Sequence, residues 1–509
     1  MELSIERKME SFHYFIVFVC FVFIYKLLQK RRRNLPPSPI ALPIVGHLYL
    51  LKKPIHRTLS KLSEKYGDIF FLQLGSRPAL VITSSSAFEE CFGKNDEIFA
   101  NRPPLMIGKY ISYNNTTIGM SPYGPLWRNL RRIAAIEILS SSRVNMFSSV
   151  RVQEVHSLVR HLFRGSSSSF KKVELRSRLS AAAYNIMTGM IADQRYYGED
   201  LEDFEEAKRF RELTEEIFSL GLTSNLGDSF PWLAWMDLQG VVKRMKKSAR
   251  KRDAMLQKMI DKRRRIADVE DTGREERKTM IDVLLSLQKT DPDYYTDEIL
   301  MGLIWGLLSG ATETSTTTLE WGMTLLLMYP DTLKKARSQL DDIVGHDRVL
   351  DESDLPKLPF LRCIINETLR LYPPTPVLLH SSSQDCIVRG YNIPAGTMLL
   401  ANLWSVHRDP ELWEDAASFR PERFLSMEAD REGFKWIPFG AGRRVCPGSA
   451  VGTKITCLVL GALIQCFDWR RLGEEVDMSE RPGLAMFRAQ KLEAFYAPRQ
   501  EMFHTISKL

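Results

Sequence analysis

Apolar residues recur at helical spacing over most of the chain. Stretches with this period lie around residues 125–140, 205–220, 241–266, 296–327, 330–345, 359–372 and 448–466. Shorter runs of apolar and β-branched residues between glycines and prolines predict strands at 69–74, 79–83, 386–388 and, with a break at Pro394 and Gly396, 391–400. Composition does not shift after residue 40, and no repeat is visible. The pattern predicts a mainly α protein with small β-sheets, built as a single large domain.

The N-terminal region carries an almost continuous apolar run over residues 12–28. This run is slightly short of the roughly 20 residues that a straight membrane-spanning helix needs. Basic residues at 26 and 30–33 follow it, which predicts a cytosolic location for the rest of the chain. A cleaved signal peptide is the alternative, but acidic residues precede the run and no small-residue cleavage site follows it. We expect a membrane anchor with its basic flank at 1–33, a proline-rich hinge at 34–43 and the folded domain at 44–509.

Charge narrows the class of partner. Lys and Arg outnumber Asp and Glu by 70 to 62, and part of the surplus lies in the stretch from 243 to 265. A solvated helix face explains such a run most simply, and an anionic membrane or an acidic protein partner would also fit it. The sequence has no zinc-finger spacing, no RNP-like aromatic strand and no basic region leading into heptads, so we expect no nucleic-acid binding.

One of the seven cysteines stands in an unusual setting. The cysteines are scattered, odd in number and without C-x-x-C spacing, which argues against a disulfide framework or a zinc site. Cys446, however, ends a glycine-rich loop that leads directly into an apolar helix. Pro447 suits a first helical position, and the open amides of a helix N-terminus favour a thiolate at Cys446. Nearby glycines allow a flat ligand to approach the backbone, and Arg444 can pair with an acidic group on that ligand.

This loop resembles the F-x-x-G-x-R-x-C-x-G pattern of the cytochromes P-450, matched by Phe439, Gly442, Arg444, Cys446 and Gly448. The resemblance implies a cytochrome P-450 fold that holds haem b, with Cys446 as the axial ligand of the iron. The resemblance also implies that the chain is a haem-thiolate monooxygenase. The plainer reading is a structural cysteine in a loop.

Two further segments extend the resemblance. Trp127 and Arg131 match the family's W-R-x-x-R helix, which faces a haem propionate, and Arg128 and His380 are additional cofactor-binding candidates. Glu367, Arg370 and Arg423 match a buried network on the haem side of the family's core. Without the resemblance, an E-x-x-R pair would be an ordinary surface ion pair.

A polar segment interrupts the apolar helix predicted at 301–321. Taken alone, its threonines would bond to backbone carbonyls four residues earlier in a kinked core helix. The segment resembles the family's oxygen-binding motif, which makes Glu313 and Thr314 the acid and the alcohol that deliver protons during oxygen activation. Gly310 and Ala311 stand where the family has alanine and then glycine, so the Ala311 methyl lies beside the cofactor. With that exchange, simple hydroxylation, oxidative ring closure, including methylenedioxy-bridge formation, and carbon–carbon coupling all stay open.

The anchor and proline spacer make the chain similar to plant microsomal enzymes of specialised metabolism, of the isoflavone-hydroxylase and sesamin-synthase group. This similarity implies electrons from NADPH through a separate reductase in the endoplasmic reticulum membrane, and a small lipophilic substrate. Expected pocket residues are Tyr110, Trp305, Leu307, Val377, Leu378 and Phe487. Two rival functions remain open: a reductase-independent haem-thiolate isomerase or dehydratase, and a non-enzymatic haem-binding membrane protein.

Overall fold

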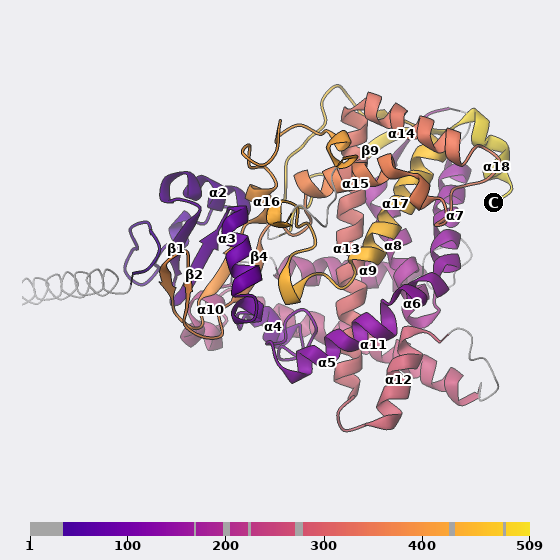
Figure 1. The fold of residues 1–509 in the computed structure, drawn as a ribbon. Coiled ribbons are helices and arrows are strands. Elements are labelled where there is room, and N and C mark those ends of the chain that lie inside the picture. Colours follow the sequence, from indigo (N-terminus) through magenta and orange to yellow (C-terminus); the bar gives the residue numbers. More distant parts are fainter. Residues whose placement is uncertain are drawn as a thin grey trace, which may run out of the picture.

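A long buried helix, α13 (Asp297–Met328), runs through the helical part of the computed structural model (Figure 1). Asp297 and Glu298 in its first turn complement the positive end of the helix dipole. Nearly all of its side chains are apolar or small, so that it can be covered on every side. It ends at Met328 because Pro330 follows, and the residue before a proline is disfavoured in a helix.

The structure describes residues 34–166, 169–196, 204–221, 225–269, 278–426, 433–481 and 485–509. The predicted anchor at 1–33 lies outside them. Residues 35–41 of the predicted hinge form no helix or strand, and the Pro37 carbonyl accepts a hydrogen bond of 2.8 Å from the Phe71 amide. Among the described residues, α17 (Ser449–Cys466) is the one helix apolar and long enough to cross a membrane. Since 72% of that segment is buried inside the protein, it is a core helix.

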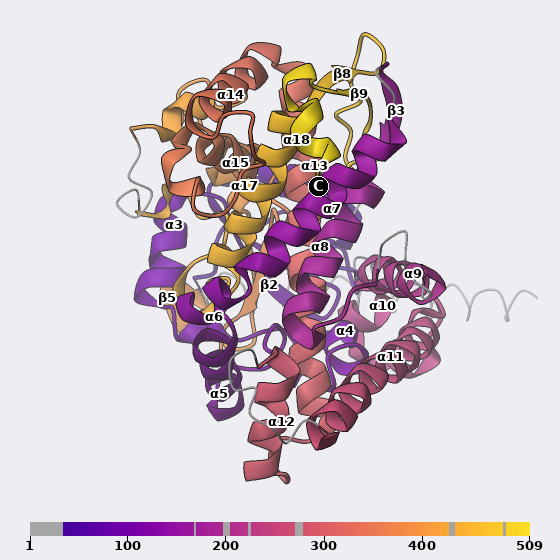
Figure 2. The ribbon, with the colours of Figure 1, turned by 90° about the vertical axis from the view of Figure 1, so that its right-hand side faces the viewer.

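Helices pack around α13 on several sides, as two perpendicular views show (Figures 1 and 2). Besides α13 and α17, the longer helices of the molecule are α2 (Ile55–Tyr66), α5 (Pro125–Ile133), α7 (Ser148–Gly165), α8 (Leu175–Ala192), α9 (Phe204–Gly221), α11 (Val241–Val269), α12 (Met280–Thr290), α14 (Pro330–Ile343) and α15 (Pro359–Leu371). Of these, α8, α11, α12, α14 and α15 pack against α13. The short ones are α3 (Ser85–Glu89), α4 (Met106–Tyr110), α6 (Ser141–Met146), α10 (Leu226–Ser229), α16 (Leu403–Val406) and α18 (Phe503–Ser507). One large apolar core joins α13 to α8, α15 and α17.

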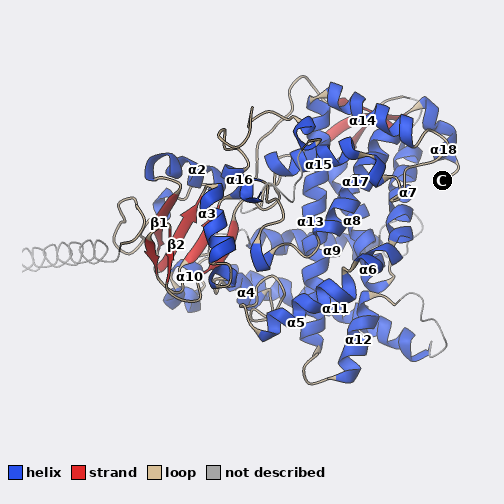
Figure 3. Ribbon diagram, in the orientation of Figure 1, coloured by secondary structure: helices blue, strands red, loops and turns tan. Residues whose placement is uncertain are grey.

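Strands gather mainly at one side of the molecule (Figure 3). There, β1 (Ile69–Leu74) pairs antiparallel with β2 (Arg77–Ile82), β2 pairs parallel with β7 (Met398–Ala401), and β7 pairs antiparallel with β4 (Leu378–Ser381). A second sheet has the order β3 (Lys171–Glu174), β9 (Glu493–Pro498) and β8 (Phe467–Arg471), and β5 (Cys386–Val388) forms a hairpin with β6 (Tyr391–Ile393). The prediction of a mainly α fold with small sheets is confirmed.

The buried network expected at the E-x-x-R segment is present. Glu367 and Arg370 on α15 are fully buried, and the Arg370 guanidinium donates to both carboxylate oxygens at 2.7 and 2.8 Å. Arg423 Nε donates to the same carboxylate at 3.1 Å. Arg370 also donates to the carbonyls of His407 and Ala416, each at 2.7 Å. The network therefore ties α15 to the loops that precede the Cys446 segment.

Candidate active site

The Cys446 loop is clamped against the segment at residues 90–97. The Cys446 amide donates to the Phe439 carbonyl at 2.9 Å, which closes the loop on itself. Gly442 has φ +66°, and a Cβ at this position would lie 2.1 Å from Oδ1 of Asp96. That carboxylate accepts a hydrogen bond of 3.0 Å from the Arg443 amide and an ion pair from its guanidinium. Glycine is therefore required at 442 both by conformation and by space.

Helix α17 begins at Ser449, with Gly448 as its N-cap residue. The prediction that Pro447 takes the first helical position is wrong by two residues. The physical reason is that a helical hydrogen bond first forms between the Gly452 amide and the Gly448 carbonyl, at 2.8 Å. Cys446 consequently lies three residues ahead of the helix, before the turn formed by Pro447 and Gly448.

Cys446 is exposed, whereas the other described cysteines are buried or half-buried. Burial nevertheless raises the pKa of the Cys446 thiol, while a hydrogen bond from the Gly448 amide and the charge of Arg131 lower it. Cys446 is thus accessible to solvent and yet surrounded by protein on most sides. We infer that it lies at the bottom of a recess. A backbone amide does favour the thiolate, as the sequence predicts, but in the protein without a bound cation burial raises the pKa of the thiol more than this amide lowers it. Coordination to a metal ion removes the thiol proton outright.

A stripe of small residues on α13 is accessible within the otherwise buried helix. From residue 300 to residue 327, only Gly306, Gly310, Ala311 and Thr314 are not buried. Their spacing places them on one face. A Cβ at Gly310 would meet no atom within 4 Å, so there is open space beside this glycine. We call these four residues the open stripe.

Close contacts and hydrogen bonds link the open stripe to the region around Cys446. A Cβ at Gly306 would lie 3.4 Å from Ile118, whose carbonyl accepts from Trp127 Nε1 at 3.1 Å and from Arg444 at 3.3 Å. Burial lowers the pKa of Arg444, and the positive charges of Arg102 and Arg131 lower it further. The charge of Arg131 also lowers the pKa of the Cys446 thiol. The accessible thiol and the open stripe thus belong to one region.

Three arginines gather in this region without an acidic partner among the described residues. Burial lowers the pKa of Arg102 to about 10 and that of Arg444 to about 9, and it also lowers the pKa of Arg131. Arg102 donates to the Gly119 carbonyl at 3.0 Å, and Arg444 donates to carbonyls of the same stretch. Desolvated guanidinium groups that meet only neutral acceptors gain most from an anionic ligand.

The other cofactor candidates fall into two groups. Trp127 is buried and lies under the Arg444 guanidinium, 4.4 Å from it, so it belongs to this cationic group. His380 is buried beside it, and its Nδ1 lies 2.8 Å from the Phe99 carbonyl. Burial holds the pKa of His380 well below its usual value, so the ring is neutral and donates to that carbonyl. Arg128 is exposed over the Tyr123 ring and lies outside the group.

Sequence reasoning missed Arg102. It follows a short helical turn at 98–100 and matches no spacing that the loop or helix motifs share. Only its position in space, next to Arg444 and His380, identifies it as part of the cationic group.

The expected acid and alcohol point in different directions. Thr314 is half-buried on the open stripe and donates to the Gly310 carbonyl at 2.6 Å. Glu313 is buried and forms an ion pair of 2.8 Å with Arg176 on α8, which also pairs with Glu320 at 2.7 Å. Burial raises the pKa of Glu313, and Arg176 opposes that rise. Thr314 therefore faces the recess, whereas the carboxyl of Glu313 is held behind it.

Most of the expected pocket residues are buried. Trp305 and Phe487 are buried beside the guanidinium groups of Arg252 and Arg176 respectively, and Val377 packs in the core under the four-stranded sheet. Leu378 is half-buried and would touch a Cβ at Gly440, at 3.7 Å. Tyr110 is half-buried beneath two lysines. Large apolar side chains mark core and pocket alike, so the sequence could not separate them.

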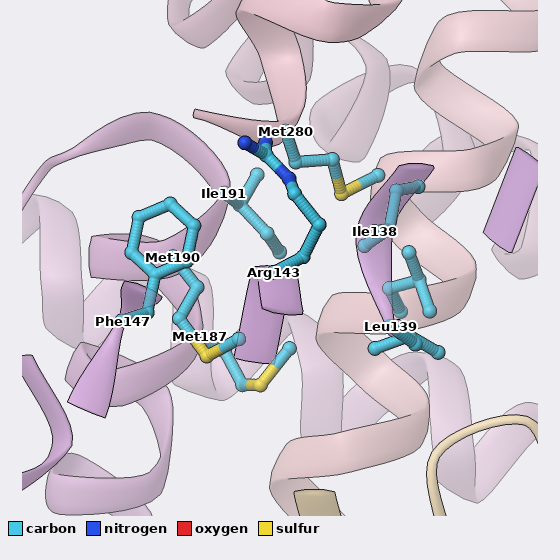
Figure 4. Close-up of a pocket in the computed structure, with 9 residues that line it drawn as sticks. Ile138, Leu139, Arg143, Phe147, Met187, Met190, Ile191 and Met280 are labelled. Carbon is cyan, nitrogen blue, oxygen red and sulfur yellow. The ribbon is translucent and has the colours of Figure 1, made fainter. Parts of the chain in front are cut away.

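Leu307 lines a small apolar cavity with eight other residues (Figure 4). The others are Ile138, Leu139, Arg143, Phe147, Met187, Met190, Ile191 and Met280. Arg143, the single charged residue in this lining, already donates to the Glu137 and Lys278 carbonyls at 3.0 and 2.6 Å. The cavity has no acid, hydroxyl or thiol, and it therefore offers no group for chemistry.

Residues 36–493 match the model of the Cytochrome P450 family, and the chain belongs to this family. It is 49% identical to Cytochrome P450 81Q32 of Catharanthus roseus, over 94% of this chain and 95% of that protein. It is 45% identical to isoflavone 2'-hydroxylase of Glycyrrhiza echinata, covering 96% and 97%, and 44% identical to (+)-piperitol/(+)-sesamin synthase of Sesamum radiatum, covering 94% of each. A zebra fish cytochrome P450 structure with progesterone superposes with a TM-score of 0.74 at 25% identity, over 88% of this chain and 100% of that one.

The chain is accordingly a cytochrome P450 monooxygenase that uses haem b, receives electrons from a redox partner reductase and acts on small lipophilic molecules. The recess fits this cofactor on three counts. It offers an accessible thiol, a group of arginines without an acidic partner among the described residues, and open space beside a helix of small residues.

The thermal stability of glycine variants tests whether the space beside Gly310 is open. Because a Cβ at Gly310 meets no atom, we expect Gly310→Ala to keep or raise the thermal unfolding midpoint, since alanine favours a helix by about 1 kcal/mol. Gly461→Ala on α17 is the control, because its Cβ would lie 2.7 Å from Leu350 and 2.9 Å from Leu361. Overpacking there costs about 1–3 kcal/mol and should lower the midpoint. An equal loss in both variants would mean that the open stripe is packed.

Proposed function

We propose that Cys446 is the axial ligand of the haem iron, and that the chain oxidises a small lipophilic plant metabolite in a reaction that consumes oxygen and NADPH. The accessible thiol in the recess, linked through Arg131 and Arg444 to the open stripe, is the observation that carries this proposal. Bound in the recess, the haem supplies the redox chemistry and activates oxygen. The thiolate of Cys446 would hold the iron and supply it with electron density.

The cationic group would hold the acidic edge of the cofactor. Arg102, Arg131 and Arg444 supply charge, and the Trp127 indole supplies a further donor. An anion placed among them restores the guanidinium pKa values that burial lowers, so binding the cofactor also stabilises this part of the fold. Phe439, Gly442 and Gly448 shape the loop around the thiol and leave room for a flat ligand.

Thr314 would hold a proton donor next to the reacting atoms. Its hydroxyl lies on the open stripe, and its hydrogen bond to the Gly310 carbonyl sets the direction of the oxygen lone pairs. Glu313 would return a proton to Thr314 after each turnover. Burial raises the pKa of the Glu313 carboxyl, which favours its protonated form, and the ion pair with Arg176 fixes its position on the side of α13 away from the recess. The Ala311 methyl takes space beside Thr314 that a glycine would leave for water.

The substrate we propose is a phenylpropanoid, flavonoid, terpenoid or alkaloid, oxidised by hydroxylation or by oxidative ring formation. Relatives named isoflavone 2'-hydroxylase and (+)-piperitol/(+)-sesamin synthase support both outcomes, at 45% and 44% identity.

Membrane attachment would place the chain in the endoplasmic reticulum, through a single-pass anchor at residues 1–33 with the folded domain in the cytosol. Exposed apolar side chains support a face that touches the bilayer: Ile44 is 77% exposed, and Trp235, in the turn that follows α10, is 82% exposed. The two segments lie together, because the amides of Gly75 and Ser76 donate to the carbonyls of Val45 and Ser229. Indole rings at a surface commonly settle at the lipid–water boundary.

The bilayer contact predicts quenching of tryptophan emission. In vesicles with bromine-labelled acyl chains, the full-length protein should lose part of its tryptophan emission, and the double variant Trp232→Phe, Trp235→Phe should lose much less. The matched control is Trp469→Phe, since Trp469 is buried in β8. Equal quenching in the wild type and the double variant would contradict the contact.

Turnover tests the proposed reaction. With NADPH, reductase and an aromatic substrate, we expect Thr314→Ala to consume NADPH but to form roughly 100-fold less product, with hydrogen peroxide in its place, because proton delivery is lost. Thr314→Ser keeps the hydroxyl and should recover product. Thr316→Ala is the control, since its buried hydroxyl also bonds to a carbonyl four residues earlier.

Isotope labelling separates the alternatives in the same assay. With ¹⁸O₂, hydroxylation places one labelled oxygen in the product, whereas oxidative ring closure sends both oxygen atoms to water and leaves the product unlabelled. Product formation without oxygen and NADPH would identify an isomerase or dehydratase and refute the monooxygenase reaction. A haem-binding protein without catalysis would form no product in any variant.

A further inference from the structure

Residues 106–121, which we call the covering segment, lie over the beginning of the glycine face on α13. Gly302, Gly306 and Gly310 recur at every fourth position of the helix. A Cβ at Gly302 would lie 3.5 Å from Thr117 and 3.6 Å from Tyr113, and one at Gly306 would lie 3.4 Å from Ile118. Nothing lies within 4 Å of a Cβ at Gly310. The covering segment therefore contacts the glycine face at Gly302 and Gly306 but not at Gly310, where the open space begins.

The covering segment contains a left-handed turn of three consecutive residues without glycine. Tyr113, Asn114 and Asn115 have φ values of +47°, +53° and +63°. Asparagine tolerates this region, but a tyrosine there costs about 1–2 kcal/mol. Such a conformation persists only where the surroundings hold it. The amides of Asn114 and Asn115 donate to the carbonyls of Lys109 and Gly108, which close the turn.

A buried arginine on α11 meets this turn. Arg252 is 1% exposed and lies between two rings, 4.3 Å from the centroid of Tyr113 and 5.5 Å from that of Trp305 on α13. It donates to the Ile111 carbonyl and, at 2.9 and 2.7 Å, to the carboxylate of Asp253. The Tyr113 hydroxyl donates to the same carboxylate oxygen at 2.5 Å. Burial raises the pKa of Tyr113, so its hydroxyl remains a donor.

The covering segment is also held at both of its ends. Its first amide, that of Met106, donates to the Asp228 carboxylate of α10 at 2.7 Å. At the other end, the carbonyls of Ile118, Gly119 and Ser121 accept from the cationic group beside the thiol. Between these ends the segment meets α11 at Tyr110, whose ring centroid lies 5.0 Å from Lys246 Nζ, and at the hydrogen-bonded set of Tyr113, Arg252 and Asp253.

We propose that Tyr113, Arg252 and Asp253 form a tether that positions the covering segment over the recess and selects ligands by size as they enter and leave. The proposal rests on the proposed function, since the ligands it selects are those that reach the haem. Ligands narrow enough to pass beneath the segment do not need the tether to open, whereas wider aromatic ligands do. The three residues are positioning residues, because they touch the segment and not the reacting atoms.

Removing one hydroxyl tests the tether with little change in shape. Tyr113→Phe keeps the ring against Arg252 and loses the hydrogen bond to Asp253. In the haem-loaded, full-length protein, stopped-flow absorbance at the Soret band gives the association and dissociation rate constants of two probes, imidazole and 1-phenylimidazole. We expect both rate constants of 1-phenylimidazole to rise about tenfold, which corresponds to losing one hydrogen bond to a charged group, and those of imidazole to change less than twofold.

Two companion variants sharpen the comparison. Asp253→Asn keeps an acceptor for Tyr113 but loses the charge, so it should give a smaller rise for the same probe. The control is Tyr294→Phe, which removes the hydroxyl of a ring that is 39% exposed in the turn between α12 and α13. It should leave all four rate constants unchanged.

Hydrogen–deuterium exchange provides a readout that does not depend on the haem. The amides of Asn114 and Asn115 should exchange faster in Tyr113→Phe than in the wild type, while those of α17 keep their rates. Unchanged rate constants for 1-phenylimidazole, or an equal rise for both probes with a lower unfolding midpoint, would overturn the tether. Loss of thiolate ligation would appear separately, as an altered spectrum of the reduced carbon monoxide complex in the wild type.

Discussion

An interior face that must remain open constrains the whole structure. Helix α13 is buried on all sides except for a stripe of glycine, alanine and threonine, and close packing elsewhere in the core keeps this stripe in place. Any larger side chain on the stripe would fill the recess, and any looser packing around α13 would let it collapse. The buried Glu367–Arg370 pair and the clamped Cys446 loop serve the same end, because they fix the segments on the other side of the recess.

Electrostatics add a second constraint. Arg102, Arg131 and Arg444 come from three separate parts of the chain. Burying their charged side chains together costs free energy, because the guanidinium groups lose water, and the same loss of water lowers their pKa values. Backbone carbonyls of the covering segment accept hydrogen bonds from Arg102 and Arg444, but these neutral groups do not balance the positive charge. An anionic cofactor supplies the balancing charge. Arg102 and Arg444 therefore serve two purposes. They would bind the cofactor, and they hold the covering segment in place over the recess.

The sequence was most informative where function requires contiguous residues. The Cys446 loop was recognised because its glycines, arginine and cysteine lie within ten positions, and the amphipathic helices α11, α14 and α15 lie where their periodicity predicted them. Helix α8 was missed because 14 of its 18 residues are buried, so no polar face alternates with an apolar one. Strand β2 starts two residues earlier than predicted.

Groups assembled from distant segments could not be predicted. Arg102 joins the cationic group only in three dimensions, and the Glu313–Arg176 pair spans 137 residues of sequence. The sequence identified Glu313 as an acid beside Thr314, but adjacent residues on a helix point about 100° apart, and only the structure reveals that the carboxyl faces α8. The same holds for Trp305 and Phe487, whose size suited either a pocket wall or the core.

Ligation of the iron by Cys446 is tested most directly by the carbon monoxide difference spectrum of the dithionite-reduced protein. The wild type should show the Soret band from which the family takes its name, and Cys446→Ser should lose it, while Cys386→Ser, at a half-buried cysteine in the β5–β6 hairpin, should keep it. The same band in folded, haem-loaded Cys446→Ser would contradict thiolate ligation by Cys446 and the reaction proposed for this chain.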